Sequence, residues 1–124
     1  MLVTETGDRT VKTPVATMFG LAAPSQGSEE LSTWRVEMAA DSPSPLHTID
    51  REQVWMPIDG TFSFTVDGST SEVAAGQALI VPAGAERQSH APGAPAQALV
   101  CMRPGGTAGV PGNGGARQPL PWAS

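Results

Sequence analysis

The sequence predicts a single all-β domain, built as an antiparallel sandwich or barrel. The chain has 124 residues, a length that suits one domain. Its 14 Gly and 12 Pro are too many turn residues for a helical bundle. Apolar and polar residues alternate through the middle of the chain, and turn signals recur about every ten residues, as in sandwiches and barrels.

The expected strands follow from this alternation and from the turn residues that interrupt it. In the segment 31–38, Trp34, Val36 and Met38 share one face. Asp59-Gly60 and Asp67-Gly68 are hairpin signals on either side of a strand whose phenylalanines also share a face. The predicted strands are 13–21, 31–38, 52–58, 61–66, 72–74, 78–81, 87–90 and 97–102.

Residues 103–124 form a C-terminal segment that is set apart by its composition. It holds six Gly and four Pro among 22 residues, with Trp122 near its end. Such a tail is commonly mobile, whereas a tryptophan between prolines is equally suited to docking on the barrel or on a second subunit. We therefore place the barrel, with its N-terminal strands, at residues 1–102 and leave both arrangements of the tail open.

Charge and composition narrow the classes of partner. Seven basic against twelve acidic residues give a net charge of −5, so we expect neither nucleic-acid binding nor a basic membrane anchor. No apolar run approaches the length of a membrane span, and the first eight residues are neither basic nor strongly apolar, so we expect neither a membrane span nor a signal peptide. Its single cysteine excludes an internal disulfide and a cysteine-based zinc site. We expect a cytoplasmic protein with a small-molecule partner.

Two segments resemble the paired motifs of the cupin superfamily of small jelly-roll barrels. Gly76, Pro82 and Gly84 reproduce the spacing that begins the second cupin motif. The segment 46–60 is similar to the first motif, with His47 at its first position and Gly60 at its last. The resemblance covers about a third of the chain and implies a cupin jelly-roll barrel. It also implies a homodimer, because cupins commonly pair through the edge of a sheet.

The departures from the cupin pattern concern its metal ligands. The four ligand positions hold His47, Ile49, Gln53 and Arg87, where the family pattern has His, His, Glu and His. A transition-metal site needs about three good N, O or S donors, and arginine remains protonated in proteins. The sequence therefore predicts that the inherited metal site is lost and that no cofactor is bound.

A shifted metal site is the alternative to this loss. It would use His47 with Gln53 and, if a bulge intervenes, His90. Strand alternation argues against it, because Glu52 and His90 fall on the opposite face from Gln53 and Arg87.

The residues that replace the metal ligands suggest acid/base chemistry inside the barrel. We expect His47 to exchange protons, Gln53 to hold a carbonyl group and Arg87 to bind a developing negative charge. Each also has a purely structural interpretation, as a hydrogen-bonding or ion-pairing residue. We expect the substrate to be bound by Trp55, Ile49, Trp34 and Met38, although the same side chains could simply fill the core.

The sequence is compatible with three functions. The preferred one is a metal-independent cyclase or isomerase acting on a carbonyl-containing, polyketide-like metabolite, since small cupins of this kind resemble polyketide cyclases of secondary metabolism. The second is a metal-dependent dioxygenase or lyase with a divergent site. The third is a non-catalytic cupin that binds a small molecule.

Overall fold

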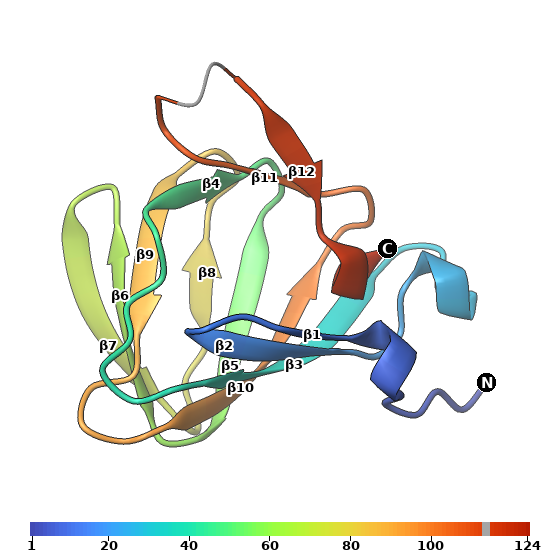
Figure 1. Cartoon of the computed structure of the whole chain (residues 1–124), viewed down its shortest axis with the longest axis horizontal. Helices are drawn as coiled ribbons and strands as arrows, with labels where there is room; N and C mark the ends of the chain where they lie inside the picture. The colour runs from blue at the N-terminus through green and yellow to red at the C-terminus, as the bar shows by residue number, and fades with distance from the viewer. Residues whose placement is uncertain (113–114) are drawn as a thin grey trace.

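Two antiparallel sheets face each other and form a jelly-roll barrel (Figure 1). The computed structural model describes residues 1–112 and 115–124, and within them each sheet has six strands. The first sheet has the order β1-β2-β3-β10-β5-β8, and the second has the order β12-β11-β4-β9-β6-β7. The strands are β1 (Thr10–Lys12), β2 (Ala16–Gly20), β3 (Ser32–Met38), β4 (His47–Ile49), β5 (Gln53–Asp59), β6 (Thr61–Val66), β7 (Ser69–Ala74), β8 (Leu79–Val81), β9 (Glu86–His90), β10 (Ala96–Met102), β11 (Thr107–Gly109) and β12 (Arg117–Pro119).

The predicted all-β cupin fold is confirmed, and the eight expected strands correspond to β2, β3 and β5–β10. Strands β1, β4, β11 and β12 were not predicted. Each has only three residues, too few for a periodic pattern to stand out. No helix in the described part of the chain is long and apolar enough to cross a membrane.

The core lies between the sheets and uses the side chains that alternation assigned to the inner face. Trp34, Val36 and Met38 of β3 are each 3% exposed, and Phe62 and Phe64 of β6 are fully buried opposite them. The hairpin from β6 to β7 turns at residues 67–68, where both backbones have positive φ, 47° and 81°. An Asp-Gly pair tolerates this conformation, which explains the tight connection.

The C-terminal segment is part of the barrel. Strand β11 pairs with β4, where Ala108 is opposite Ile49, and β12 pairs with β11. The short 3₁₀ turn η3 (Pro121–Ala123) follows, and Ser32 Oγ donates a 2.6 Å hydrogen bond to the carbonyl oxygen of Ala123. Leu120 is 4% exposed. The sequence left open whether residues 103–124 are a mobile tail or dock on the barrel, and in the structure they dock on it (Figure 1). The predicted division after residue 102 therefore does not separate a free tail from the fold.

Candidate active site

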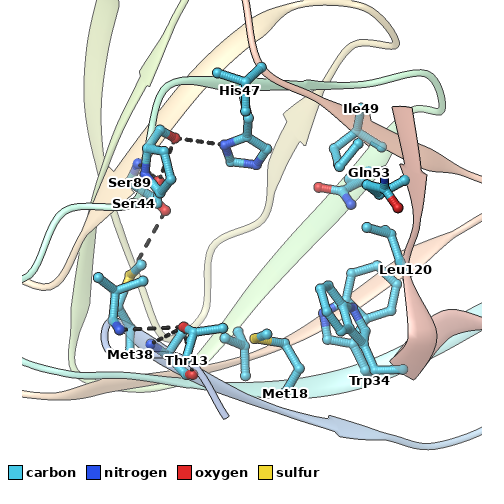
Figure 2. Close-up of a pocket in the computed structure, with 18 of the residues that line it drawn as sticks. Thr13, Met18, Trp34, Met38, Ser44, His47, Ile49, Gln53, Ser89 and Leu120 are labelled. Carbon is cyan, nitrogen blue, oxygen red and sulfur yellow. Dashed lines mark hydrogen bonds between the residues drawn. The ribbon is translucent and has the colours of Figure 1, made fainter. Parts of the chain in front are cut away.

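A cavity of about 360 Å³ lies between the two sheets and is the candidate active site (Figure 2). Strands β2 and β3 form one wall, β4, β5 and β9 supply His47, Gln53 and Ser89, and the C-terminal segment closes a third side. Six of the seven residues predicted for the site line it: Trp34, Met38, His47, Ile49, Gln53 and Trp55. Cavities of this size and apolar character commonly bind small molecules.

His47 begins β4, and one residue separates it from the Ser-Pro-Ser-Pro segment at 42–45. Its Nδ1 is 2.8 Å from the carbonyl oxygen of Pro45. Because a carbonyl can only accept, Nδ1 carries the proton, and the lone pair of the neutral ring is on Nε2. Nε2 has no partner among the described residues, and Figure 2 shows it turned toward the cavity.

The environment of His47 favours its neutral form. Burial is the main cause that lowers the pKa of the imidazole, and the positive charge of Arg87 lowers it further. The hydrogen bond to Pro45 acts in the opposite direction and is outweighed. His47 is therefore a neutral base at physiological pH, with its basic nitrogen facing the cavity.

Gln53 begins β5 and is 4% exposed. Its Oε1 accepts hydrogen bonds from Trp55 Nε1 at 3.1 Å and from Arg87 Nη1 at 3.3 Å. The indole N–H and the guanidinium can only donate, so the amide atom that faces them must be the oxygen. The Nε2 group consequently points the other way, where it donates a weak 3.6 Å bond to Met102 Sδ. Gln53 lines the cavity, and the second N–H of its Nε2 group has no hydrogen-bond partner among the described residues.

Arg87 lies behind Gln53 and does not line the cavity. It is 1% exposed, and on β9 it is directly opposite His47 on β4. Its guanidinium donates to the carbonyl oxygens of Pro82 at 3.0 Å and Ala85 at 3.1 and 3.2 Å, besides Gln53. Burial lowers the pKa of Arg87 to about 10, so it stays protonated at neutral pH. Arg87 can therefore act on a ligand in the cavity through its hydrogen bond to the Gln53 amide.

Aromatic side chains set the shape of the cavity. Trp55 packs edge-on against Phe62 and Phe64, with ring centroids 5.7 and 4.8 Å apart. Trp34 packs edge-on against Trp122 from η3, at 6.3 Å. Trp122 and Leu120 line the cavity but were not assigned to the site from the sequence. The only sequence feature that pointed to them was the presence of large apolar residues between the last prolines.

The residues present do not fit the metal that the family pattern would hold. Ile49 offers no donor, and Gln53 Oε1 already accepts from a cation, Arg87. His90 and Glu52, the alternative ligands, do not line the cavity, and Glu52 is exposed. No cluster of three His, Cys, Asp or Glu side chains that could hold a metal occurs within residues 1–112 and 115–124.

Comparison with known families supports the assignment made from fold and geometry. A family model described as a cupin domain matches residues 34–109, which include both motifs and most of the cavity wall. The chain belongs to the cupin family. No curated protein matches this cupin in sequence.

Several solved structures are similar to this cupin in fold. The polyketide cyclase RemF from Streptomyces resistomycificus has a TM-score of 0.67 at 21% identity, covering 82% of this chain and 73% of that one. DMSP lyase DddQ from Ruegeria pomeroyi has 0.64 at 22%, covering 72% of this chain and 47% of its own. A single-residue variant of oxalate decarboxylase from Bacillus subtilis has 0.75 at 14%, covering 85% and 30%. This cupin thus spans under half the length of the lyase and about a third of the decarboxylase.

Proposed function

We propose that this cupin is a metal-independent enzyme that uses acid/base chemistry to cyclise or isomerise a carbonyl-containing, polyketide-like metabolite inside its barrel. The observation that carries this proposal is the orientation of His47. The carbonyl of Pro45 holds the Nδ1 proton, so that the basic Nε2 faces an apolar cavity. The fold of the polyketide cyclase RemF is compatible with this chemistry.

The first step is removal of a proton from the carbon next to a substrate carbonyl. The C–H bond breaks, its proton passes to His47 Nε2, and its electron pair moves onto the carbonyl oxygen to form an enolate. The free N–H of Gln53 donates to that oxygen, and its strength as a donor increases because Arg87 polarises the amide from behind.

The second step decides whether the product is an isomer or a ring. In an isomerisation, the imidazolium returns the proton to a different carbon. In a cyclisation, the enolate carbon attacks a second carbonyl of the same molecule, a C–C bond forms, and the new alkoxide takes the proton from His47. Both sequences leave the enzyme unchanged and need neither an oxidant nor a reductant.

A non-catalytic binding protein is the second candidate. It is favoured by the composition of the cavity wall, in which aromatic and aliphatic side chains greatly outnumber polar ones. A metal-dependent dioxygenase or lyase is disfavoured by the donor set, because an isoleucine and a guanidinium occupy positions where ligands belong.

Hydrogen–deuterium exchange at an activated carbon tests the proposal without knowledge of the natural substrate. The probe is 2-tetralone, a flat ketone with acidic C–H bonds, followed by NMR in deuterated buffer. We expect the protein to accelerate exchange and His47→Ala to reduce the acceleration by about 100-fold or more, a typical contribution of a general base.

The matched control is His90→Ala, which removes the other histidine of the chain from outside the cavity. It should leave the exchange rate unchanged. Exchange that is equally fast in His47→Ala and in the wild type would remove His47 from the mechanism. Binding of tetralone with no acceleration by the wild type would favour the binding protein.

The assembly and location are further parts of the proposal. We expect a cytoplasmic homodimer with a small-molecule substrate. Exposed apolar side chains on neighbouring strands of the first sheet, Met56, Ile80 and Leu99, are compatible with pairing of two copies. Gel filtration with light scattering should give twice the mass of one chain, and the mass of a single chain would contradict the dimer.

A further inference from the structure

The guanidinium of Arg87 is a buried positive charge without a carboxylate partner. Its hydrogen bonds go to the carbonyls of Pro82 and Ala85 and to the amide of Gln53, all of which are neutral. Among the described residues, no Asp or Glu lies within ion-pair distance of it. Burying an ion in this way is costly, so such a charge is commonly balanced by a partner that the free protein does not contain.

The charged and titratable groups around Arg87 leave this charge uncompensated. On β4 its direct neighbour is His47, whose neutral form is favoured. On β6 its neighbour is the apolar Val66. Asp67, in the turn that follows β6, raises the pKa of Arg87, but it is exposed and its Oδ1 accepts from the backbone of Glu86. Glu86 is also exposed.

The cavity itself adds no compensating charge. Among the described residues that line it, none is Asp, Glu, Lys or Arg, and His47 is the one titratable side chain. Arg87 connects a positive charge to the cavity wall, because its Nη1 donates to Oε1 of Gln53, which lines the cavity. In a wall of low polarity, this charge acts on a ligand more strongly than it would in water.

The geometry points to a ligand that binds as an anion: a flat, apolar molecule with an acidic enolic or phenolic hydroxyl group, held as the enolate or phenolate with its oxygen on Gln53 Nε2. This inference rests on the proposed function and specifies its substrate class. The walls formed by Trp34 and Trp55 suit a planar ring. The Arg87 charge, transmitted by the amide dipole of Gln53, stabilises the deprotonated oxygen, and a cationic ligand has no partner in the same cavity.

The test uses 4-nitrophenol, whose anion absorbs visible light whereas its neutral form does not. In the presence of excess protein, we expect the pKa of bound nitrophenol to fall by about one unit or more, equivalent to a tenfold preference for the anion. The neutral methyl ether 4-nitroanisole should bind at least about tenfold more weakly than the phenolate. Equal affinities of the two probes, or an unshifted absorbance titration, would overturn the inference even if no variant could be studied.

Variants test whether the preference for the anion comes from Arg87. Arg87→Met should abolish the shift, whereas Arg103→Met, which removes the same charge from an exposed position, should retain it. His47→Ala should also retain most of the shift. Loss of the shift in His47→Ala but not in Arg87→Met would assign the stabilising charge to an imidazolium and contradict the inference. Failure of the exchange assay with tetralone would count against the proposed base and leave this binding preference standing.

Discussion

His47 and Arg87 are direct neighbours across β4 and β9, so that an imidazole and a guanidinium lie side by side within the barrel. In cupins that follow the family pattern, these are two metal-ligand positions. Here one of them keeps a base and the other carries a fixed positive charge that acts on that base. Burial and this charge both disfavour the imidazolium, so the pKa of His47 is lowered and the ring stays available as a proton acceptor.

The first prediction is a pH dependence with its midpoint below 6.5, the ordinary pKa of histidine. Deuterium exchange should fall as the pH drops through the pKa of His47, because only neutral imidazole accepts a proton. NMR titration of the His47 ring measures the pKa directly. In Arg87→Met the pKa of His47 should rise, because a neighbouring positive charge has been removed. A pKa at or above 6.5 in the wild type would contradict the geometry.

The same group makes a stability prediction of defined sign. The pKa of His47 is lower in the folded than in the unfolded chain. Between the two values the unfolded chain binds a proton that the folded chain does not, so the free energy of unfolding rises with pH across this window. The His47 contribution is complete above 6.5 and is lost as the pH falls toward the folded-state pKa. Urea denaturation from about pH 5 to 8 should show this slope in the wild type and a smaller slope in His47→Ala.

The second prediction concerns the amide of Gln53. In Gln53→Leu, the N–H groups of Trp55 and Arg87 both lose their acceptor inside the barrel, which should cost about 2–4 kcal/mol of unfolding free energy. Gln53→Glu keeps an acceptor for both and adds an ion pair with Arg87, so it should fold at least as stably as the wild type.

The glutamate variant also separates folding from function. It lacks the N–H that we assign to the substrate oxygen, so the exchange of tetralone should fall by about 100-fold, the typical effect of losing one oxyanion donor. Full activity in Gln53→Glu would mean that the amide N–H does not contact the reacting oxygen. Full stability in Gln53→Leu would mean that Trp55 and Arg87 find other acceptors.

Much of the barrel could be predicted from sequence because its strands are long enough for alternation to show. Trp34 and Met38 on β3 are two residues of such a pattern, and they face the cavity as their spacing indicates. The three-residue strand β4 has no such pattern and was not predicted as a strand, but the motif spacing singled out His47 and Ile49, which lie on it and line the cavity. The face on which a residue lies could therefore be predicted where strand alternation or motif spacing defined it.

How close an inward-facing side chain lies to the cavity could not be predicted in the same way. Alternation puts Gln53 and Arg87 on the inner face, but it does not say which one meets the ligand. The structure places Gln53 at the cavity and Arg87 behind it, because the guanidinium finds backbone carbonyls at the turn that contains Pro82 and Ala85. The docking of the C-terminal segment was likewise not evident from its glycines and prolines, because it depends on the pairing of β11 with β4 and on the packing of Trp122 against Trp34.

The third prediction concerns the ligand positions of the family pattern. Protein purified without chelator should contain no stoichiometric transition metal, because Ile49 is no donor and Arg87 repels a cation. The triple variant Ile49→His, Gln53→Glu and Arg87→His restores the three missing ligand types beside His47 and should gain metal. Elemental analysis of both proteins checks this. A bound metal in the wild type would contradict the metal-independent mechanism.

The fourth prediction concerns Trp122, whose Nε1 is buried without an acceptor among the described residues. Trp122→Phe removes this N–H and keeps most of the aromatic surface that contacts Trp34, so the unfolding free energy should change little or increase. Trp122→Ala removes the contact itself and opens the cavity wall, which should cost about 2–3 kcal/mol.

Ligand binding separates the two roles of this side chain. The cavity wall is intact in Trp122→Phe, so its affinity for nitrophenolate should stay close to that of the wild type, whereas Trp122→Ala should bind more weakly because the wall on that side is missing. Denaturation curves and probe titrations measure the two effects independently. Should Trp122→Phe lose both stability and affinity while keeping its fold, the indole N–H would have an acceptor after all, and the C-terminal segment would have to sit differently against β3.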